Sequence, residues 1–199
     1  MVSSYKGVPP NKWSEVTRRL IKKHPLSPDE IVDIVLSSWD SIFASIMGTK
    51  GFKIGVEIFP KPQIMGFLLH ELIPLELASK YPKIWRPEIS SGDKDIVYIA
   101  NDHYSIELKT SSNPHHIYGN RSYAQKSSKG KKAKSGYYLA VNFEKFSDKK
   151  SLPRVKLIRF GWLDASDWIG QKSATGQQSR LPPDVENFKL KELYSVYSK

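Results

Sequence analysis

The chain has 199 residues, of which 39% are hydrophobic and 12% aromatic, enough for a folded core and too many for a disordered protein. It contains no cysteine, which excludes disulfide frameworks and zinc sites with cysteine ligands. The net charge of +11 indicates a polyanionic partner, nucleic acid first and an anionic membrane surface second. Because the sequence shows neither a signal peptide nor an apolar run of about 18 residues, we expect a cytoplasmic protein with no membrane contact.

The first 60 residues are predicted to be largely helical. Residues 11–23 have the pattern of a short basic amphipathic helix. A longer helix is predicted from Ser27, a natural N-cap, because proline follows it and Glu30 completes a capping box. The apolar residues of this second helix recur at helical spacing and predict a place in the core, with a dimer contact as the alternative.

A third helix is predicted over residues 61–80. Glu71 lies inside its apolar stripe, and Pro74 predicts a kink beside it, because proline cannot donate to the carbonyl of His70. Glu71 therefore either contacts a functional site or faces water. The predicted core-facing stripe consists of Ile64, Phe67, Leu68, Leu72 and Leu75.

From Ile96 onward the apolar pattern becomes that of strands. We predict strands at residues 95–100, 104–111, 135–143 and 154–162, separated by polar loops. Helices followed by strands in a chain of this length predict a single α/β domain over residues 1–199, with a small mixed β-sheet flanked by helices.

Acidic and basic residues alternate with apolar ones in the segment YSIELKTS. Since side chains alternate along a strand, Glu107 and Lys109 should share one face while the apolar residues between them enter the core. Asp95 begins the preceding strand. A turn at residues 101–103 would place Asp95 opposite Lys109 and diagonal to Glu107, whereas a two-residue turn would place it on the other face.

These residues suit metal-dependent phosphodiester chemistry. Carboxylates on neighbouring strands can hold Mg²⁺, so Asp95 and Glu107 are predicted metal ligands. Lys109 can position or deprotonate the attacking water or pair with phosphate oxygens, and Glu71 is a candidate further ligand or base. The spacing leaves Asp93 open as an alternative to Asp95.

The segments DKDI at 93–96 and ELK at 107–109 resemble the PD-(D/E)XK nuclease motif, with Asp95 as the first acid. The usual proline of that motif is replaced by Lys94. The motif alone covers about 20 residues and indicates a nuclease.

A wider resemblance comes from the segments GFLLHELIPLELA, SGDKDIVYI, SIELKTSS, IYGNRSYAQ and FGWLDASDWIGQKSATGQQSRL. Together they resemble type II restriction endonucleases, most closely the ScaI-like group. The resemblance implies a restriction-endonuclease-like core, with catalytic core and recognition loops in residues 61–185. It also implies a homodimer that uses Mg²⁺ to cut both strands of a short palindrome in double-stranded DNA, and a host methyltransferase that protects the DNA without being a stable subunit.

Two polar loops contain the residue types that read bases. Arginine can bond guanine, and asparagine or glutamine can bond adenine, through two hydrogen bonds each. The lysine-rich run that begins at residue 126 is either solvated or in contact with phosphates. The predicted DNA-binding residues are Ser111, Ser112, Asn120, Arg121, Gln125, Lys126, Gln177, Gln178 and Arg180.

Two alternatives stay open at this point. A non-specific or structure-specific nuclease of the same fold, acting in repair or junction resolution, would cut at no fixed position. A non-enzymatic basic DNA-binding protein would bind DNA without metal and would tolerate Asp95→Asn. The polar loops favour sequence specificity over the first alternative, and the acid pair disfavours the second.

Overall fold

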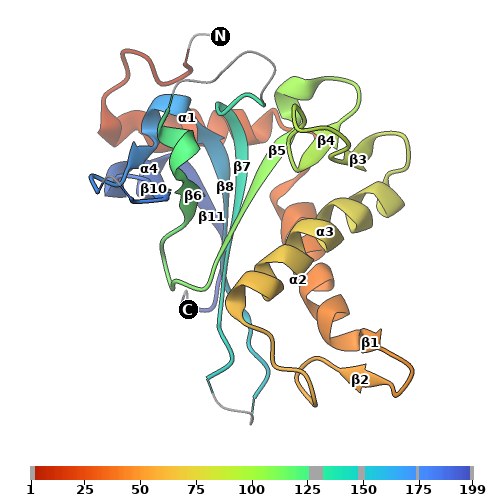
Figure 1. Cartoon of the computed structure of the whole chain (residues 1–199). Helices are drawn as coiled ribbons and strands as arrows, with labels where there is room; N and C mark the ends of the chain where they lie inside the picture. Colours follow the sequence, from red (N-terminus) through yellow and green to blue (C-terminus); the bar gives the residue numbers. More distant parts are fainter. Residues whose placement is uncertain (1–2, 126–131, 148–150, 174, 198–199) are drawn as a thin grey trace.

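A six-stranded sheet in the order β11–β8–β7–β5–β4–β3 forms the centre of the computed structural model, which describes residues 3–125, 132–147, 151–173 and 175–197 (Figure 1). β5 and β7 run parallel and the other neighbouring strands antiparallel, so the predicted mixed sheet is confirmed. The strands are β3 (Trp85–Pro87), β4 (Ile96–Tyr98), β5 (Ile106–Ser111), β7 (Gly136–Phe143), β8 (Val155–Leu163) and β11 (Leu190–Ser195).

Helices flank this sheet, as predicted, and the two faces are covered differently (Figure 1). Ile106 and Leu108 of β5 belong to the larger core, which the three long helices share. Tyr138 and Ala140 of β7 point the opposite way, into a smaller core beneath a short helix. The helices are α1 (Trp13–Lys22), α2 (Pro28–Ala44), α3 (Pro62–Lys80) and α4 (Pro183–Phe188), and none within the described ranges is long and apolar enough to cross a membrane.

The second helix begins as the sequence predicts. The Ser27 hydroxyl accepts a hydrogen bond from the backbone N–H of Glu30 at 3.3 Å, and the Glu30 carboxylate accepts one from the Ser27 N–H at 2.9 Å. The apolar face of α2 lies in the larger core, which confirms its predicted packing role. A short hairpin, β1 (Ile46–Met47) and β2 (Phe52–Lys53), then leads to α3.

The predicted apolar stripe of α3 is only partly right: Leu68 and Leu72 pack against the larger core, but the other three residues do not. Ile64, Phe67 and Leu75 are 53%, 60% and 52% exposed. The helix is apolar on two sides, so spacing alone cannot choose the buried one, and Gly66 identifies it. A Cβ added at this glycine would lie 2.7 Å from the Thr110 hydroxyl of β5, so only a very small residue permits this approach. The buried residues of α3 are Met65, Gly66, Leu69, Ile73, Pro74 and Leu77.

The connection between β4 and β5 also differs from the prediction. It spans residues 99–105 and contains a short 3₁₀ helix, Asp102–Tyr104, in place of a turn at 101–103. Ile96 pairs with Ile106, so the same register carried one residue further sets Asp95 opposite Glu107 rather than opposite Lys109. The predicted turn, 101–103, and the observed connection, 99–105, both have an odd number of residues. Asp95 therefore keeps the predicted face of the sheet.

A small polar sheet lies beside α4, where the sequence predicted only loops. β10 (Gln178–Arg180) pairs with both β6 (Tyr118–Asn120) and β9 (Ile169–Gly170), and a 3₁₀ helix, Arg121–Ala124, follows β6. These strands have two or three residues each, too few for a visible alternation. We call residues 118–125 and 169–180, as far as the structure describes them, the polar arm.

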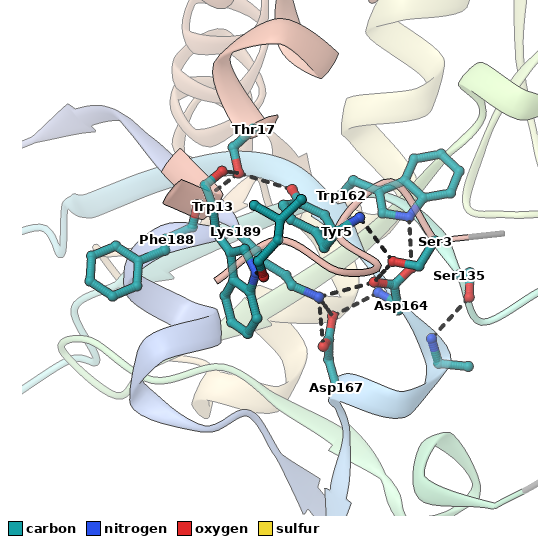
Figure 2. Close-up of polar contacts among 12 residues, drawn as sticks. Ser3, Tyr5, Trp13, Thr17, Ser135, Trp162, Asp164, Asp167, Phe188 and Lys189 are labelled. Atoms are coloured by element: carbon teal, nitrogen blue, oxygen red, sulfur yellow. Dashed lines mark hydrogen bonds and ion pairs between the residues drawn. The ribbon is translucent and has the colours of Figure 1, made fainter. Parts of the chain in front are cut away.

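A buried ammonium group joins the N-terminal segment to the C-terminal part of the chain (Figure 2). Lys189 Nζ lies 3.0 Å from Asp164 Oδ2 and 2.8 Å from Asp167 Oδ1. The rings of Tyr5 and Trp13 cover it, with centroids 4.2 Å and 4.7 Å from Nζ. We call Asp164, Asp167 and Lys189 the buried lysine cluster.

Both carboxylates of this cluster have further hydrogen-bond donors. Asp164 accepts from the Ser3 hydroxyl at 2.6 Å and from the Trp162 indole at 3.2 Å, and Asp167 accepts from the Asp164 N–H at 2.7 Å. A buried charge with partners on several sides stabilises one arrangement and leaves no open ligand position. The cluster is therefore a structural clamp.

Candidate active site

Asp95 and Glu107 meet at the strand pair β4–β5. Asp95 lies two residues after the turn of residues 90–93, and its Oδ2 accepts a 2.6 Å hydrogen bond from the backbone N–H of Leu108. This bond ties the Asp95 side chain to the strand that carries Glu107. Glu107 itself is buried, because its neighbours on the sheet and the polar arm cover it. The predicted pair of carboxylates is thus brought together.

Two lysines complete this site. Lys109 Nζ lies 2.7 Å from Glu107 Oε1 and donates to the Leu108 carbonyl at 3.0 Å. Lys132 Nζ lies between the acids, 3.1 Å from Asp95 Oδ1 and 3.0 Å from Glu107 Oε2. We call Asp95, Glu107, Lys109 and Lys132 the cleft cluster. Asp95 and Glu107 each turn one oxygen toward the same cation.

Electrostatics favour the ionised forms of Glu107 and Lys132. Burial alone would raise the pKa of Glu107, but the ammonium groups of Lys109 and Lys132 outweigh it and lower that pKa below its ordinary value. Burial would lower the pKa of Lys132, yet the carboxylates of Glu107 and Asp95 raise it. Glu107 therefore stays negative and attracts cations at neutral pH.

The cleft cluster opens into a cavity of about 540 Å³, between α3 and the polar arm. His70 of α3 lines this cavity, with Nδ1 3.8 Å from Asp95 Oδ2. Burial lowers the pKa of the His70 imidazole, and the Asp95 carboxylate offsets this only in part. His70 was missed because the wrong face of its helix was predicted to be buried, although it lies four residues after Gly66.

Glu71 is exposed and lies beside the site rather than within it. It lines a neighbouring cavity of about 540 Å³ together with His70, Glu88 and the end of β5. Burial, and then the negative charge of Asp95, raise the pKa of Glu88. Two acids thus flank the cleft cluster at this second cavity, and only Glu71 was predicted. Pro74 lies inside α3, which continues as one helix to Lys80.

The choice between Asp93 and Asp95 has a geometric answer. Asp93 Oδ2 accepts a hydrogen bond from the Arg86 guanidinium at 2.9 Å and from the backbone N–H groups of Ile89 and Ser90 at 3.1 and 3.2 Å. These bonds hold the pKa of Asp93 down to about 2. Asp93 therefore stabilises its own turn, and Asp95 is the acid beside Glu107.

The predicted DNA-binding residues fall into two groups. Gln125 and Asn120 are exposed and line the cavity of the cleft cluster, while Ser111 and Ser112 line the neighbouring cavity. Lys126 lies outside the described residues. The side chains that line the two cavities share one side of the molecule with the acid pair.

The remaining predicted readers lie farther along the polar arm. Gln177, Gln178 and Arg180 are exposed there. The Arg121 guanidinium instead donates to the carbonyls of Ser173 and Gly176 at 3.2 and 3.0 Å, so it supports the loop before β10.

Tyr123 connects this arm to the acid pair and was not predicted. Its hydroxyl donates to Glu107 Oε1, and its ring centroid lies 4.6 Å from Lys109 Nζ. Burial, and then the Glu107 carboxylate, raise the pKa of Tyr123, so the hydroxyl keeps its proton. Neither Tyr123 nor Lys132 could be found from spacing, because both reach the site from outside the two strands.

The donor set suits a hard divalent cation. In the part of the chain that the structure describes, no group of three or more His, Asp or Glu side chains is arranged to hold a metal ion. Mg²⁺ needs fewer protein ligands, because it keeps several waters and takes one or two carboxylates plus substrate phosphate. Asp95 and Glu107 fit that requirement, since the oxygens facing Lys132 already share a cation.

Fold and site together define a class of protein. A mixed sheet flanked by helices, with two carboxylates and a lysine on adjoining strands beside an open cleft, is the arrangement of a restriction-endonuclease-like nuclease. The profile of the ScaI restriction endonuclease family matches residues 3–194. The type II restriction enzyme ScaI of Streptomyces caespitosus is 55% identical over 195 residues, 97% of this chain and 85% of that enzyme.

The chain therefore belongs to the ScaI restriction endonuclease family. The resemblance seen in the motifs is confirmed, and with it the expected activity of a restriction endonuclease, a site-specific deoxyribonuclease. No solved structure matches the chain significantly.

Proposed function

We propose that this protein hydrolyses double-stranded DNA at a short palindrome, with Mg²⁺ held by Asp95 and Glu107. The observation that carries the proposal is the shared cation position, where Lys132 Nζ lies 3.1 Å from one carboxylate and 3.0 Å from the other. A structural ion pair has no need of a cleft, whereas this pair faces a cavity of about 540 Å³. Bound Mg²⁺ would supply positive charge against the scissile phosphate.

The protein's own groups prepare the attack. Lys109, fixed 2.7 Å from Glu107, is placed to orient the attacking water or to donate to a phosphate oxygen. Attack forms a new bond from phosphorus to the water oxygen and breaks the bond to the 3′ oxygen, which leaves a 5′-phosphate. Burial keeps His70 neutral beside Asp95, and Glu71 supports the site from its edge.

DNA binding would use the charge of the chain and the polar arm. The net charge of +11 favours the phosphate backbone without regard to sequence. Base reading would fall to exposed side chains of the arm, and Arg121 would hold the loop that presents them. The proposed DNA contacts are Ser111, Ser112, Asn120, Gln125, Lys126, Gln177, Gln178 and Arg180.

The assembly follows from the substrate. Each copy presents one cleft cluster, and a palindrome has two identical half-sites, so a homodimer with two-fold symmetry would cut both strands. A cytoplasmic enzyme of this specificity requires that a host methyltransferase protect the same sequence, as a separate protein. The mass of the complex with DNA, from sedimentation velocity, tests the dimer.

Digestion of phage DNA tests the proposed function. Wild-type protein should give discrete fragments whose sequenced ends share one palindrome, with Mg²⁺ present and not in EDTA. Asp95→Asn should abolish cutting, while Asp93→Asn, the matched change in the neighbouring turn, should cut at the same site. A smear of fragments would support the non-specific nuclease instead, and uncut but retarded DNA would support the DNA-binding protein.

A further inference from the structure

Tyr123 lies where the polar arm meets the cleft cluster. On the catalytic side, its hydroxyl bonds the Glu107 oxygen that also accepts from Lys109, and its ring covers the Lys109 ammonium at 4.6 Å. A carboxylate and an aromatic face thus confine the lysine between them. Both residues are proposed catalytic groups, so Tyr123 holds two of them at once.

On the other side, the Tyr123 ring packs closely against Trp168, which precedes β9, and against β6 of the polar arm. The Tyr123 ring lies 5.1 Å from that of Trp168. A Cβ on Gly119 of β6 would lie 3.2 Å from the Tyr123 ring and 2.9 Å from the Ser179 hydroxyl of β10. The Tyr123 ring therefore lies close against β6 at Gly119, and β10 lies close against the same glycine, so a shift of β6 toward the ring would displace it.

The predicted base readers lie on these same strands. Asn120 pairs with Gln178 across β6 and β10. The backbone N–H of the next residue, Arg121, donates to the Gln177 carbonyl in the loop before β10 at 2.8 Å. Tyr123 follows within the same 3₁₀ helix. The predicted base reader Asn120 is therefore connected to Glu107 through the 3₁₀ helix Arg121–Ala124 and the side chain of Tyr123.

We propose that Tyr123 is a positioning residue that couples base reading by the polar arm to the placement of Glu107 and Lys109. This inference rests on the proposed function. When the arm fits the correct bases, Tyr123 would hold the acid and the lysine in their cutting positions. When a wrong base shifts the arm, the hydroxyl bond and the ring contact would be lost together.

The test uses Tyr123→Phe, which removes the hydroxyl and keeps the ring against Lys109 and Trp168. Tyr81→Phe is the matched control, because the Tyr81 hydroxyl also donates to a carboxylate, that of Glu30, away from the cleft. The cleavage site read from wild-type ends defines a cognate duplex, and changing one base pair defines near-cognate duplexes. Single-turnover rates are measured with Mg²⁺, and DNA binding is measured with Ca²⁺ in its place.

Tyr123→Phe should lower the cognate rate by about ten- to a hundredfold, the effect of a lost hydrogen bond to a charged group. Near-cognate rates should fall less, so the ratio of the cognate to the near-cognate cleavage rate should decrease. DNA binding and thermal stability should stay close to wild type. Tyr81→Phe should keep the wild-type discrimination. A merely structural role of Tyr123 would lower stability without changing the ratio of the two rates.

Two results overturn the proposal and leave the proposed function intact. One is a Tyr123→Phe enzyme that cuts the cognate duplex at the wild-type rate. The other is an equal loss of cleavage rate at cognate and near-cognate duplexes, because an equal loss would mean that Tyr123 does not respond to the bases. Wild-type protein without any fixed cleavage position would instead overturn the proposed function, and the coupling with it.

Discussion

Among the described residues, the buried lysine cluster and the cleft cluster share residue types and differ in their surroundings. In the buried lysine cluster, one ammonium has both carboxylates within 3.0 Å and two aromatic rings above it. In the cleft cluster, two ammonium groups contact two carboxylates beside an open cavity of about 540 Å³. The first arrangement is closed, whereas the second can exchange a lysine for another cation.

Exposure and an adjoining cavity distinguish a charged cluster that can bind a cation from one that only stabilises the fold. Ion pairing alone is found in both clusters, so it identifies neither. What distinguishes the cleft cluster is an opening to solvent and a cation, Lys132, on a side chain that is 27% exposed and can leave.

The largest expected effect is the loss of cleavage in Glu107→Gln. The amide cannot carry the negative charge that a divalent cation and Lys109 require, so the single-turnover rate should fall by at least about a thousandfold. Stability should fall as well, because the buried Glu107 carboxylate is held by two ammonium groups, so the rate is compared per folded molecule. Asp167→Asn is the comparison and should cut normally once corrected for folded protein. Cleavage by Glu107→Gln at more than a tenth of the wild-type rate would contradict this assignment.

The next effect is on stability. Lys189→Met leaves two buried carboxylates without their cation and should lower the free energy of unfolding by about 3–5 kcal/mol. Urea denaturation followed by tryptophan fluorescence measures the change. Lys12→Met is the control, because the Lys12–Glu15 pair at 3.3 Å is on the surface and its loss should cost little. Equal stability of the two variants would mean that the buried lysine cluster is not a clamp.

A smaller effect is expected on metal affinity. Lys132 occupies the cation position, so Lys132→Met should increase Mn²⁺ affinity in the absence of DNA by about two- to tenfold. Calorimetric titration measures the affinity. Lys134→Met removes the same charge two residues away, where the ammonium donates to the Gln125 carbonyl at 2.6 Å, and should raise the affinity less. No difference between the variants would show that Lys132 does not compete with the metal.

The smallest effect is the dependence of stability on pH, and its sign differs between the clusters. Lys109 and Lys132 outweigh burial and lower the pKa of Glu107 from 4.5 to about 2, so its stabilising contribution is lost as the pH falls through that window. Burial raises the pKa of Asp167 above 3.8, so protonation there favours the native state as the pH falls.

These signs predict opposite changes in two variants. As the pH falls from 7 to 3.5, the free energy of unfolding should decrease less steeply in Glu107→Gln than in the wild type. In Asp167→Asn it should decrease more steeply. Each change is at most about 1.4 kcal/mol per pH unit. Denaturation curves at a series of pH values measure both slopes, and changes of the same sign in the two variants would contradict the account.

Local patterns in the sequence predicted part of this architecture. The capping box of α2 and the alternation around Glu107 and Lys109 were predicted correctly. Each pattern depends only on residues a few positions apart in the sequence. The partner of Asp95 was wrong by two residues, because a 3₁₀ helix lengthened the loop. Its face was right because only the parity of the loop decides it.

Features that depend on distant segments were not predictable in the same way. The buried side of α3 is chosen by Gly66 meeting Thr110, a contact between residues 44 positions apart. His70, Tyr123 and Lys132 enter the site from a helix, a 3₁₀ helix and a loop, and no spacing relates them to Asp95. The strands of the polar arm are too short to show a period.

The central claim is that the cleft cluster performs chemistry and the buried lysine cluster holds the fold. The most direct test compares two identical substitutions, Lys109→Met and Lys189→Met, for both single-turnover cleavage of DNA and thermal unfolding. The account predicts that Lys109→Met loses cleavage per folded molecule and lowers the melting temperature less than Lys189→Met does, because Lys132 still contacts Glu107. Lys189→Met should melt earlier still and cut normally per folded molecule. A Lys109→Met enzyme that cuts at the wild-type rate would contradict the account.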